Sequence, residues 1–285
     1  MNLLLTVVLF AFAQTSCAVT SETVVPSKQY ITKKVKVGDF DGISTATSID
    51  VVYTQTLGMQ DIEVYAPDNL MEYVKIEVEE GVLKVKFQSK ENPFNGINIR
   101  GKHQTEVRVF APAIHTLRAS SSGDIMLKNG LQTQGQVTMK SSSSGDIEGG
   151  EIVCDELIAS ASSSGDVILD KVECRSLNVD ASSSGDVTIK TLKAETVEAD
   201  ASSSGDVILS GECRSANLSA SSSGDVEAKN LKANRVVAGA SSAGDVTCYP
   251  VESLKASASS SGSVNYKGDP KDIDFHPKKG LNKID

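Results

Sequence analysis

The sequence predicts an all-β protein, a parallel β-solenoid with about 20 residues per coil and about eight coils. The first observation is a repeat: Ala-Ser-Ser-Ser-Gly-Asp-Val, or a close variant, occurs eight times between Ala119 and Val264. Successive repeat glycines are separated by 22, 20, 20, 20, 19, 20 and 18 residues. The second observation is composition: tryptophan is absent and aromatic residues make up 5%. A core of small aliphatic side chains suits a narrow tube better than a globule.

The alternation of residue types predicts which side chains face the core. Within residues 177–181 apolar side chains alternate with polar ones, which is the pattern of a strand with one buried face. Val187 and Ile189 indicate a second short face, and Leu192 begins a third. Three faces in each turn predict a roughly triangular tube whose successive coils lie about 4.8 Å apart.

The repeat glycines are expected at the corner between the first and second faces, where freedom to adopt positive φ favours glycine. The serine two positions before each glycine is expected to point inward. Because a buried hydroxyl without a partner costs about 1–3 kcal/mol, these serines should form hydrogen-bonded columns. The residues assigned to this corner are Gly165, Gly185 and Gly205, with Ser163, Ser183 and Ser203.

An aspartate column is the sharpest candidate for ligand binding. One aspartate follows each of the first seven repeat glycines: Asp124, Asp146, Asp166, Asp186, Asp206, Asp225 and Asp245. Stacked carboxylates repel one another, so they must stay hydrated, accept backbone N–H groups or bind cations. One hypothesis is a weak calcium ladder at Asp166, Asp186 and Asp206. The favoured interpretation is a turn residue that accepts local backbone N–H groups, and no cofactor is expected.

Outward serines such as Ser182 and Ser184 form rows of hydroxyl groups. Such rows could dock a glycan or ice lattice or accept O-linked sugars. The simpler interpretation is a solvated strand face made of small residues, and this is the one that we favour.

Two cysteines, Cys154 and Cys174, occupy the same inward position in adjacent coils. In-register neighbouring coils bring their Cα atoms within disulfide range, so a bridge is feasible in an oxidising compartment. The favoured alternative is a pair of buried thiols that act as small apolar side chains.

The remaining segments divide the chain into five parts. Residues 1–17 contain an apolar run and predict a secretory signal, or a lipoprotein signal with Cys17 as the lipidated residue. Residues 18–27 are expected to form a linker. Residues 28–118 are rich in strand patterns, including a hairpin around Glu79-Glu80-Gly81; they form either a separate domain or the first turns of the tube. Residues 119–266 form the repeat solenoid, and residues 267–285 a C-terminal cap.

The net negative charge of the chain disfavours anionic binding partners. The net charge is −9, and residues 119–266, with 20 acidic and 11 basic residues, account for all of it. This disfavours nucleic acid and anionic membrane surfaces as partners, so that the only membrane contact expected is through an N-terminal lipid. The sequence has no P-loop, no dinucleotide fingerprint and no Ser-His-Asp arrangement with a nucleophile elbow. A non-enzymatic protein is expected.

The chain resembles the bacterial family described as putative auto-transporter adhesin, head GIN domain. The resemblance lies in Phe40-Asp41-Gly42-Ile43, in Ile49-Asp50-Val51, in Val82-Leu83-Lys84-Val85 and in the serial Ser-Gly-Asp turns. It implies a right-handed β-helix-like fold, export to the outer membrane, periplasm or cell surface of a Gram-negative bacterium, and an adhesive role without catalytic residues. We therefore expect a cell-envelope interaction scaffold that binds an unknown protein or glycan. The alternative is a carbohydrate-active enzyme or glycan-binding module of the β-helix type.

Overall fold

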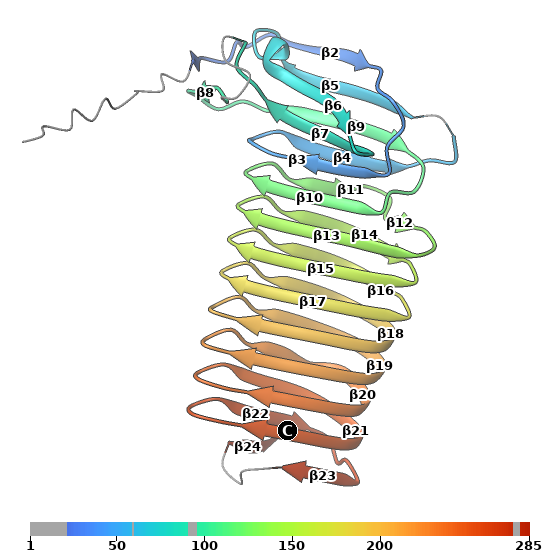
Figure 1. The fold of residues 1–285 in the computed structure, drawn as a ribbon, viewed down its shortest axis with the longest axis vertical. Coiled ribbons are helices and arrows are strands. Elements are labelled where there is room, and N and C mark those ends of the chain that lie inside the picture. The colour runs from blue at the N-terminus through green and yellow to red at the C-terminus, as the bar shows by residue number, and fades with distance from the viewer. Residues whose placement is uncertain (1–21, 59, 91–95, 276–279) are drawn as a thin grey trace, which may run out of the picture.

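The computed structural model describes residues 22–58, 60–90, 96–275 and 280–285. Within these ranges the protein is nearly all β, and its strands wind into one elongated tube (Figure 1). Twenty-two strands belong to a single continuous sheet, so the predicted β-solenoid is confirmed. The predicted signal segment and Cys17 lie outside the described residues. The one helical element of the described ranges is the short 3₁₀ turn η1 (Met71–Tyr73), and nothing helical there is long or apolar enough to cross a membrane.

The repeat region forms two stacks of parallel strands, joined at corners. The first stack begins with β10 (Thr116–Ser121), β13 (Gln136–Ser143), β15 (Glu156–Ser163) and β17 (Ser176–Ser183). The second contains β11 (Ile125–Leu127), β12 (Leu131–Gln132), β14 (Ile147–Val153) and β16 (Val167–Glu173). After that, single long strands supply both stacks: β18 (Val187–Ser202), β19 (Val207–Ser221), β20 (Val226–Ala240) and β21 (Asp245–Ala258).

Equivalent residues of successive repeats lie directly beside one another. Val187 pairs in register with Val207, which pairs in turn with Val226. The same holds on the first stack, where Ala181 lies opposite Ala201. The predicted inward residues form one continuous core of small and medium aliphatic side chains. Their removal from water stabilises the tube by roughly 25 cal/mol for each Å² of apolar surface buried.

The corner before each repeat glycine differs from the prediction. The left-handed backbone belongs to the serine, with φ of 64° at Ser163, 65° at Ser183 and 62° at Ser203. This turn ends the strand alternation, so these serines are exposed to solvent instead of facing the core. The expected inward serine column, with its hydrogen-bonded hydroxyls, is therefore wrong.

The repeat glycines serve close packing and not an unusual φ. Gly165, Gly185 and Gly205 are buried, and their φ angles lie outside the left-handed region. A Cβ atom on Gly205 would lie 2.6 Å from the backbone nitrogen of Ser182 and 2.7 Å from the carbonyl oxygen of Gly185. Because only glycine lets two backbones approach so closely, the repeat requires it at this point of every coil.

The N-terminal portion continues the same tube. Strand β3 (Gly42–Thr45) pairs in parallel with β10, and β4 (Asp50–Gln55) with β11. On their other sides lie β7 (Val82–Phe87) and β9 (Glu106–Ala111), again in parallel. Antiparallel strands complete this end: β2 (Tyr30–Val35), β5 (Asp61–Pro67) and β6 (Val74–Glu79).

Two local predictions in this portion have different outcomes. Strands β6 and β7 form the expected hairpin, and its two turn residues, Glu80 and Gly81, have positive φ, as a tight hairpin turn requires. The expected linker 18–27 instead contains β1 (Thr23–Val24), which pairs with β8 (Asn98–Ile99). Strands of two residues are too short to leave an alternating pattern in the sequence.

The C-terminal segment extends the solenoid. Strand β22 (Ser263–Lys267) follows the last repeat glycine, β23 (Asp272–Phe275) adds to β21, and β24 (Leu281–Ile284) adds to β22, all in parallel. The expected cap is thus a further partial coil. Ile273 continues the inward column of Leu254 but is 42% exposed, because β23 is paired on one side only among the described strands.

Candidate functional site

The aspartate column forms a chain of hydrogen bonds along the tube. The backbone N–H of Asp186 donates to Oδ1 of Asp166 at 2.9 Å, and that of Asp206 donates to Oδ1 of Asp186 at 2.8 Å. The chain begins at Asp50, which accepts the N–H of Asp124, and ends where Asp245 accepts the N–H and hydroxyl of Ser263. We call this column the Asp ladder. Its acceptor role matches the favoured interpretation, but the N–H groups come from the next coil and not from the local turn.

The electrostatics of the Asp ladder reflect two opposing effects. Partial burial raises the pKa of Asp166 and Asp206, and the neighbouring carboxylates raise it further. The backbone N–H bond that each carboxylate accepts acts in the opposite direction but is the smaller effect. Within residues 22–58, 60–90, 96–275 and 280–285, no three His, Cys, Asp or Glu side chains are grouped so as to hold a metal ion.

The cysteines of the described chain are buried thiols. Cys154 and Cys174 lie in adjacent coils, and each is less than a tenth exposed. Burial raises the pKa of Cys154 to about 11 and that of Cys174 to about 12. Both groups are therefore protonated near neutral pH, which makes them poor nucleophiles.

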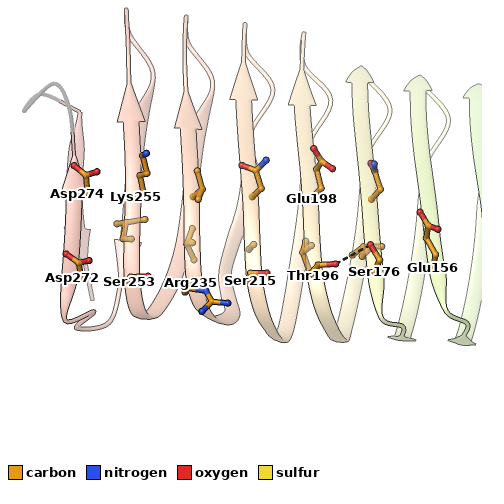
Figure 2. A pocket seen from close by; sticks show the side chains of 18 residues that line it. Glu156, Ser176, Thr196, Glu198, Ser215, Arg235, Ser253, Lys255, Asp272 and Asp274 are labelled. Atoms are coloured by element: carbon orange, nitrogen blue, oxygen red, sulfur yellow. Dashed lines mark hydrogen bonds between the residues drawn. The ribbon is translucent and has the colours of Figure 1, made fainter.

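A groove of about 630 Å³ runs along the outer face of the first stack. It crosses seven strands, β15, β17, β18, β19, β20, β21 and β23, which corresponds to roughly 29 Å at about 4.8 Å per coil. Figure 2 shows its outward side chains in two rows, with at most one residue from each coil in each row. One row contains Glu156, Ser176, Thr196, Ser215, Arg235, Ser253 and Asp272, and the other includes Asn178, Glu198, Asn217, Val237, Lys255 and Asp274.

The groove is hollow because its central side chains are short. Ser176, Thr196 and Ser215 stand side by side in adjacent coils, and Thr196 donates a hydrogen bond to Ser176 at 3.2 Å. Longer side chains flank this stretch, with Glu156 on one side and Arg235 on the other (Figure 2). The arrangement follows from the parallel register, which places outward residues of successive coils in straight rows.

Four charged groups in the groove are not neutralised by one another. In the part of the chain that the structure describes, the side chains of Glu156, Glu198, Arg235 and Lys255 form neither an ion pair within 4.0 Å nor a hydrogen bond. Elsewhere on the tube, lysines do pair with an acidic residue of the preceding coil. These pairs are Lys171–Glu151 at 2.5 Å, Lys190–Asp170 at 2.7 Å and Lys193–Glu173 at 3.3 Å.

A second hollow, of about 1030 Å³, lies beside β2 and β5 near the N-terminal end. Of its two lysines, Lys34 is already paired with Asp61 at 2.7 Å and with Glu63 at 3.3 Å, whereas Lys36 has no ion pair within 4.0 Å in the described chain. The hollow also adjoins the loop at Gly58, where the described chain is interrupted. The groove on the first stack therefore offers more groups that are free to contact a ligand.

The groove was not among the sites predicted from the sequence. The predicted candidates were the Asp ladder and the outward serines, whereas the groove lies at the start of each first-stack strand, in β17 four to six residues before Ser182. The available signal was the outward column Ser176, Thr196, Ser215, which is small and polar over three coils and is followed by Arg235. Such a column becomes visible when the repeats are aligned by their glycines.

Several solved structures have the same fold. A protein described as a "putative adhesin" from Parabacteroides merdae is 18% identical, with a TM-score of 0.67 over 93% of this chain and 100% of that chain. A "putative adhesin" from Parabacteroides distasonis is 23% identical, with a TM-score of 0.67 over 92% and 100%. A "putative lipid binding protein" from the same species is 21% identical, with a TM-score of 0.62 over 93% and 100%. At these identities the likeness concerns the fold alone.

Sequence comparison identifies the family. No curated protein matches the chain significantly. The sequence profile of one family matches residues 39–171 and again residues 166–270, so that the two matches together span residues 39–270. These residues include the Asp ladder, the groove except Asp272 and Asp274, and the N-terminal strands β3 to β9. The chain therefore belongs to the family described as "Putative auto-transporter adhesin, head GIN domain".

Proposed function

We propose that this protein is an exported, non-enzymatic interaction scaffold of the bacterial cell envelope, and that it binds its partner in the groove on the first stack. The family description, and the description of two structurally similar proteins as putative adhesins, support an adhesive role. The apolar run near the N-terminus supports export to the outer membrane, periplasm or cell surface, with Cys17 as the candidate lipid anchor.

The observation that carries this proposal is the set of unpaired charges in the groove. On the other stack, three lysines pair with an acidic residue of the preceding coil, whereas Glu198, Arg235 and Lys255 are exposed and have no charged partner within 4.0 Å in the described chain. A surface ion pair contributes only about 0–1 kcal/mol, so leaving these groups unpaired costs the fold little. They remain free to make charge-assisted hydrogen bonds to a ligand.

Cell binding tests the proposal. Fluorescently labelled protein is incubated with intact bacteria and with epithelial cells, and bound fluorescence is measured against concentration. The groove variant is Glu198→Gln/Arg235→Gln. The matched control is Glu227→Gln/Lys229→Gln, which removes the same two charges from the second-stack part of β20, where Lys229 pairs with Glu227 at 3.5 Å. We expect saturable binding that the groove variant loses and the control keeps. Equal binding by both variants, or no binding at all, would contradict the proposal.

Two further measurements concern location and catalysis. Surface labelling of intact cells, combined with the mass of the mature N-terminus, distinguishes a lipid on Cys17 from cleavage by a signal peptidase that leaves a free amino end. Turnover assays on polysaccharides test the catalytic alternative. If the protein cleaved a polysaccharide and lost that activity on mutation of one acidic residue, it would be an enzyme and the proposed non-enzymatic role would be wrong.

A further inference from the structure

The groove presents unpaired charges of both signs along its length. Glu156 and Glu198 lie in its first half, and Arg235 and Lys255 lie in neighbouring coils of its second half, next to Asp272 and Asp274 of β23 (Figure 2). Glu198 and Arg235 are two coils apart, about 10 Å, which is too far for an ion pair. Negative and positive side chains therefore lie along the same groove without neutralising one another.

This pattern discriminates between charged polymers. A polyanion would gain at Arg235 and Lys255 but would bring like charge against Glu156 and Glu198, and the repeat region as a whole is acidic. A polycation would meet the opposite problem at Arg235 and Lys255. Desolvating a charge against a like charge is unfavourable for either polymer.

Hydroxyl groups suit both halves of the groove. A hydroxyl donates one hydrogen bond and accepts two, so it can donate to Glu198 and accept from Arg235 or Lys255 without any net charge. The amides of Asn178 and Asn217, which also lie in the groove, can donate and accept in the same way. A polyhydroxylated ligand can therefore satisfy every polar group that the groove presents.

The repeat of the groove fits a sugar chain. Equivalent side-chain positions recur at every coil, about 4.8 Å apart, which is close to the length of one pyranose unit in an extended polysaccharide. An extended peptide advances by about 3.3 Å per residue and falls out of step with the coils. We propose that the groove binds a neutral glycan, extended parallel to the tube axis with about one sugar unit for each coil crossed. This inference rests on the groove as the binding site of the proposed function.

The absence of stacking surfaces in the groove predicts how affinity depends on length. None of the described residues that line it is aromatic, so binding depends on hydrogen bonds repeated over several coils. Each sugar unit then contributes modestly, and a hexasaccharide should bind at least tenfold more tightly than the disaccharide of the same linkage.

A glycan array followed by titration tests the inference. Purified protein is applied to neutral hexasaccharides of glucose, mannose and N-acetylglucosamine, to uronate hexasaccharides and to deacetylated glucosamine hexasaccharides. We expect binding among the neutral set only. Raising the salt from 50 to 500 mM should change the dissociation constant by no more than about twofold, because screening acts on charge–charge attraction. The variant Glu198→Gln/Arg235→Gln should weaken binding at least tenfold, and Glu227→Gln/Lys229→Gln should leave it unchanged, with both variants checked for native thermal unfolding.

The outcomes separate the ligand class from the function. Groove-dependent binding to cells without binding to any neutral glycan would overturn this inference and leave the interaction scaffold intact. Preference for the uronate or the glucosamine series, with steep loss of affinity in salt, would also overturn it. Neutral glycan binding that survives the groove substitutions would place the sugar elsewhere on the tube and refute the assignment.

Discussion

The glycine column offers the most direct test of how the coils pack. Replacing Gly205 with alanine adds one methyl group at a corner where the neighbouring coil leaves no room. The new Cβ atom would lie 2.6 Å from the nitrogen of Ser182, 2.7 Å from the oxygen of Gly185 and 2.8 Å from the carbonyl carbon of Ala181. All three are backbone atoms of the sheet, so relief requires two coils to separate and not merely a side chain to rotate.

The expected magnitude follows from that geometry. Forcing an extra carbon into a packed interior costs about 1–3 kcal/mol, and we expect the upper half of this range because backbone hydrogen bonds must stretch. For a chain of this size, a loss of 2–3 kcal/mol lowers the unfolding midpoint by roughly 5–10 °C. Circular dichroism during heating measures this shift.

The matched control is Gly239→Ala, in the first-stack part of β20. Its Cβ atom would have Ser257 Oγ as its nearest neighbour, at 3.8 Å, and its φ lies outside the left-handed region. Where alanine fits, the substitution stabilises by about 0.4–1 kcal/mol, because it restricts the unfolded chain. We expect an unchanged or higher midpoint. If Gly205→Ala and Gly239→Ala gave the same midpoint, the close-packed corner would be refuted.

Four other substitutions and titrations test the corner and the core. Asp186→Ala removes the acceptor of the Asp206 N–H and should destabilise by about 1–3 kcal/mol, whereas Asp186→Asn, which keeps an oxygen, should cost less; equal thermal midpoints would contradict this. Carbon-13 NMR of the carboxyl groups should show Asp166 and Asp206 titrating above the ordinary aspartate pKa. A folded pKa raised above the unfolded value means that the folded state binds the proton more tightly, so these two groups favour folding increasingly as pH falls through the folded pKa and lose that contribution as pH rises; ordinary midpoints would count against the partial burial of the ladder. Ser203→Gly should be neutral or stabilising by up to about 1 kcal/mol, because it relieves a left-handed φ of 62°; clear destabilisation would show that the hydroxyl has a structural role. Cys174 should react with iodoacetamide only after unfolding, since burial raises its pKa to about 12; rapid alkylation of the native protein, followed by mass spectrometry, would contradict this.

The sequence alone was sufficient to predict the inward columns and their register. A period of about 20 residues makes each coil a copy of the last, so alternation within one strand, such as Leu177, Val179 and Ala181, predicts burial in all of them. The hairpin of β6 and β7 was equally visible, because its turn residues separate two alternating runs. The continuity of residues 28–118 with the tube was not, since β3 and β4 pair with strands that are distant in sequence on both sides.

The backbone conformation of the corner could not be predicted from the sequence. A residue with a left-handed φ and a residue without a Cβ atom are both required there, and they lie only two positions apart. Alternation extended through Ser183 placed it inward and assigned the unusual φ to Gly185, the residue with the fewest steric limits. The structure reverses these roles: Ser183 has a left-handed φ of 65°, which short polar side chains tolerate better than branched ones. Gly185 then faces the neighbouring coil, where a Cβ atom would meet the backbone nitrogen of Ser162 at 2.6 Å. Only the contact between coils distinguishes the two assignments, and that contact is not encoded in the periodicity of a single repeat.

The periodicity of the repeat was equally insufficient to predict the groove as a binding site. Regular positions of the repeat, such as the Asp ladder, connect each coil to the next, and their carboxylates are already used by backbone N–H groups. A binding site needs groups whose hydrogen-bonding capacity is not consumed by the fold. In this tube such groups occur where the repeat varies, as at Glu198, which lies between Asn178 and Asn217, and at Arg235, which lies between Ser215 and Ser253. The stability of the solenoid and the recognition of a ligand therefore depend on different columns of residues. Substitutions in the groove columns should change ligand binding without lowering the thermal stability of the protein.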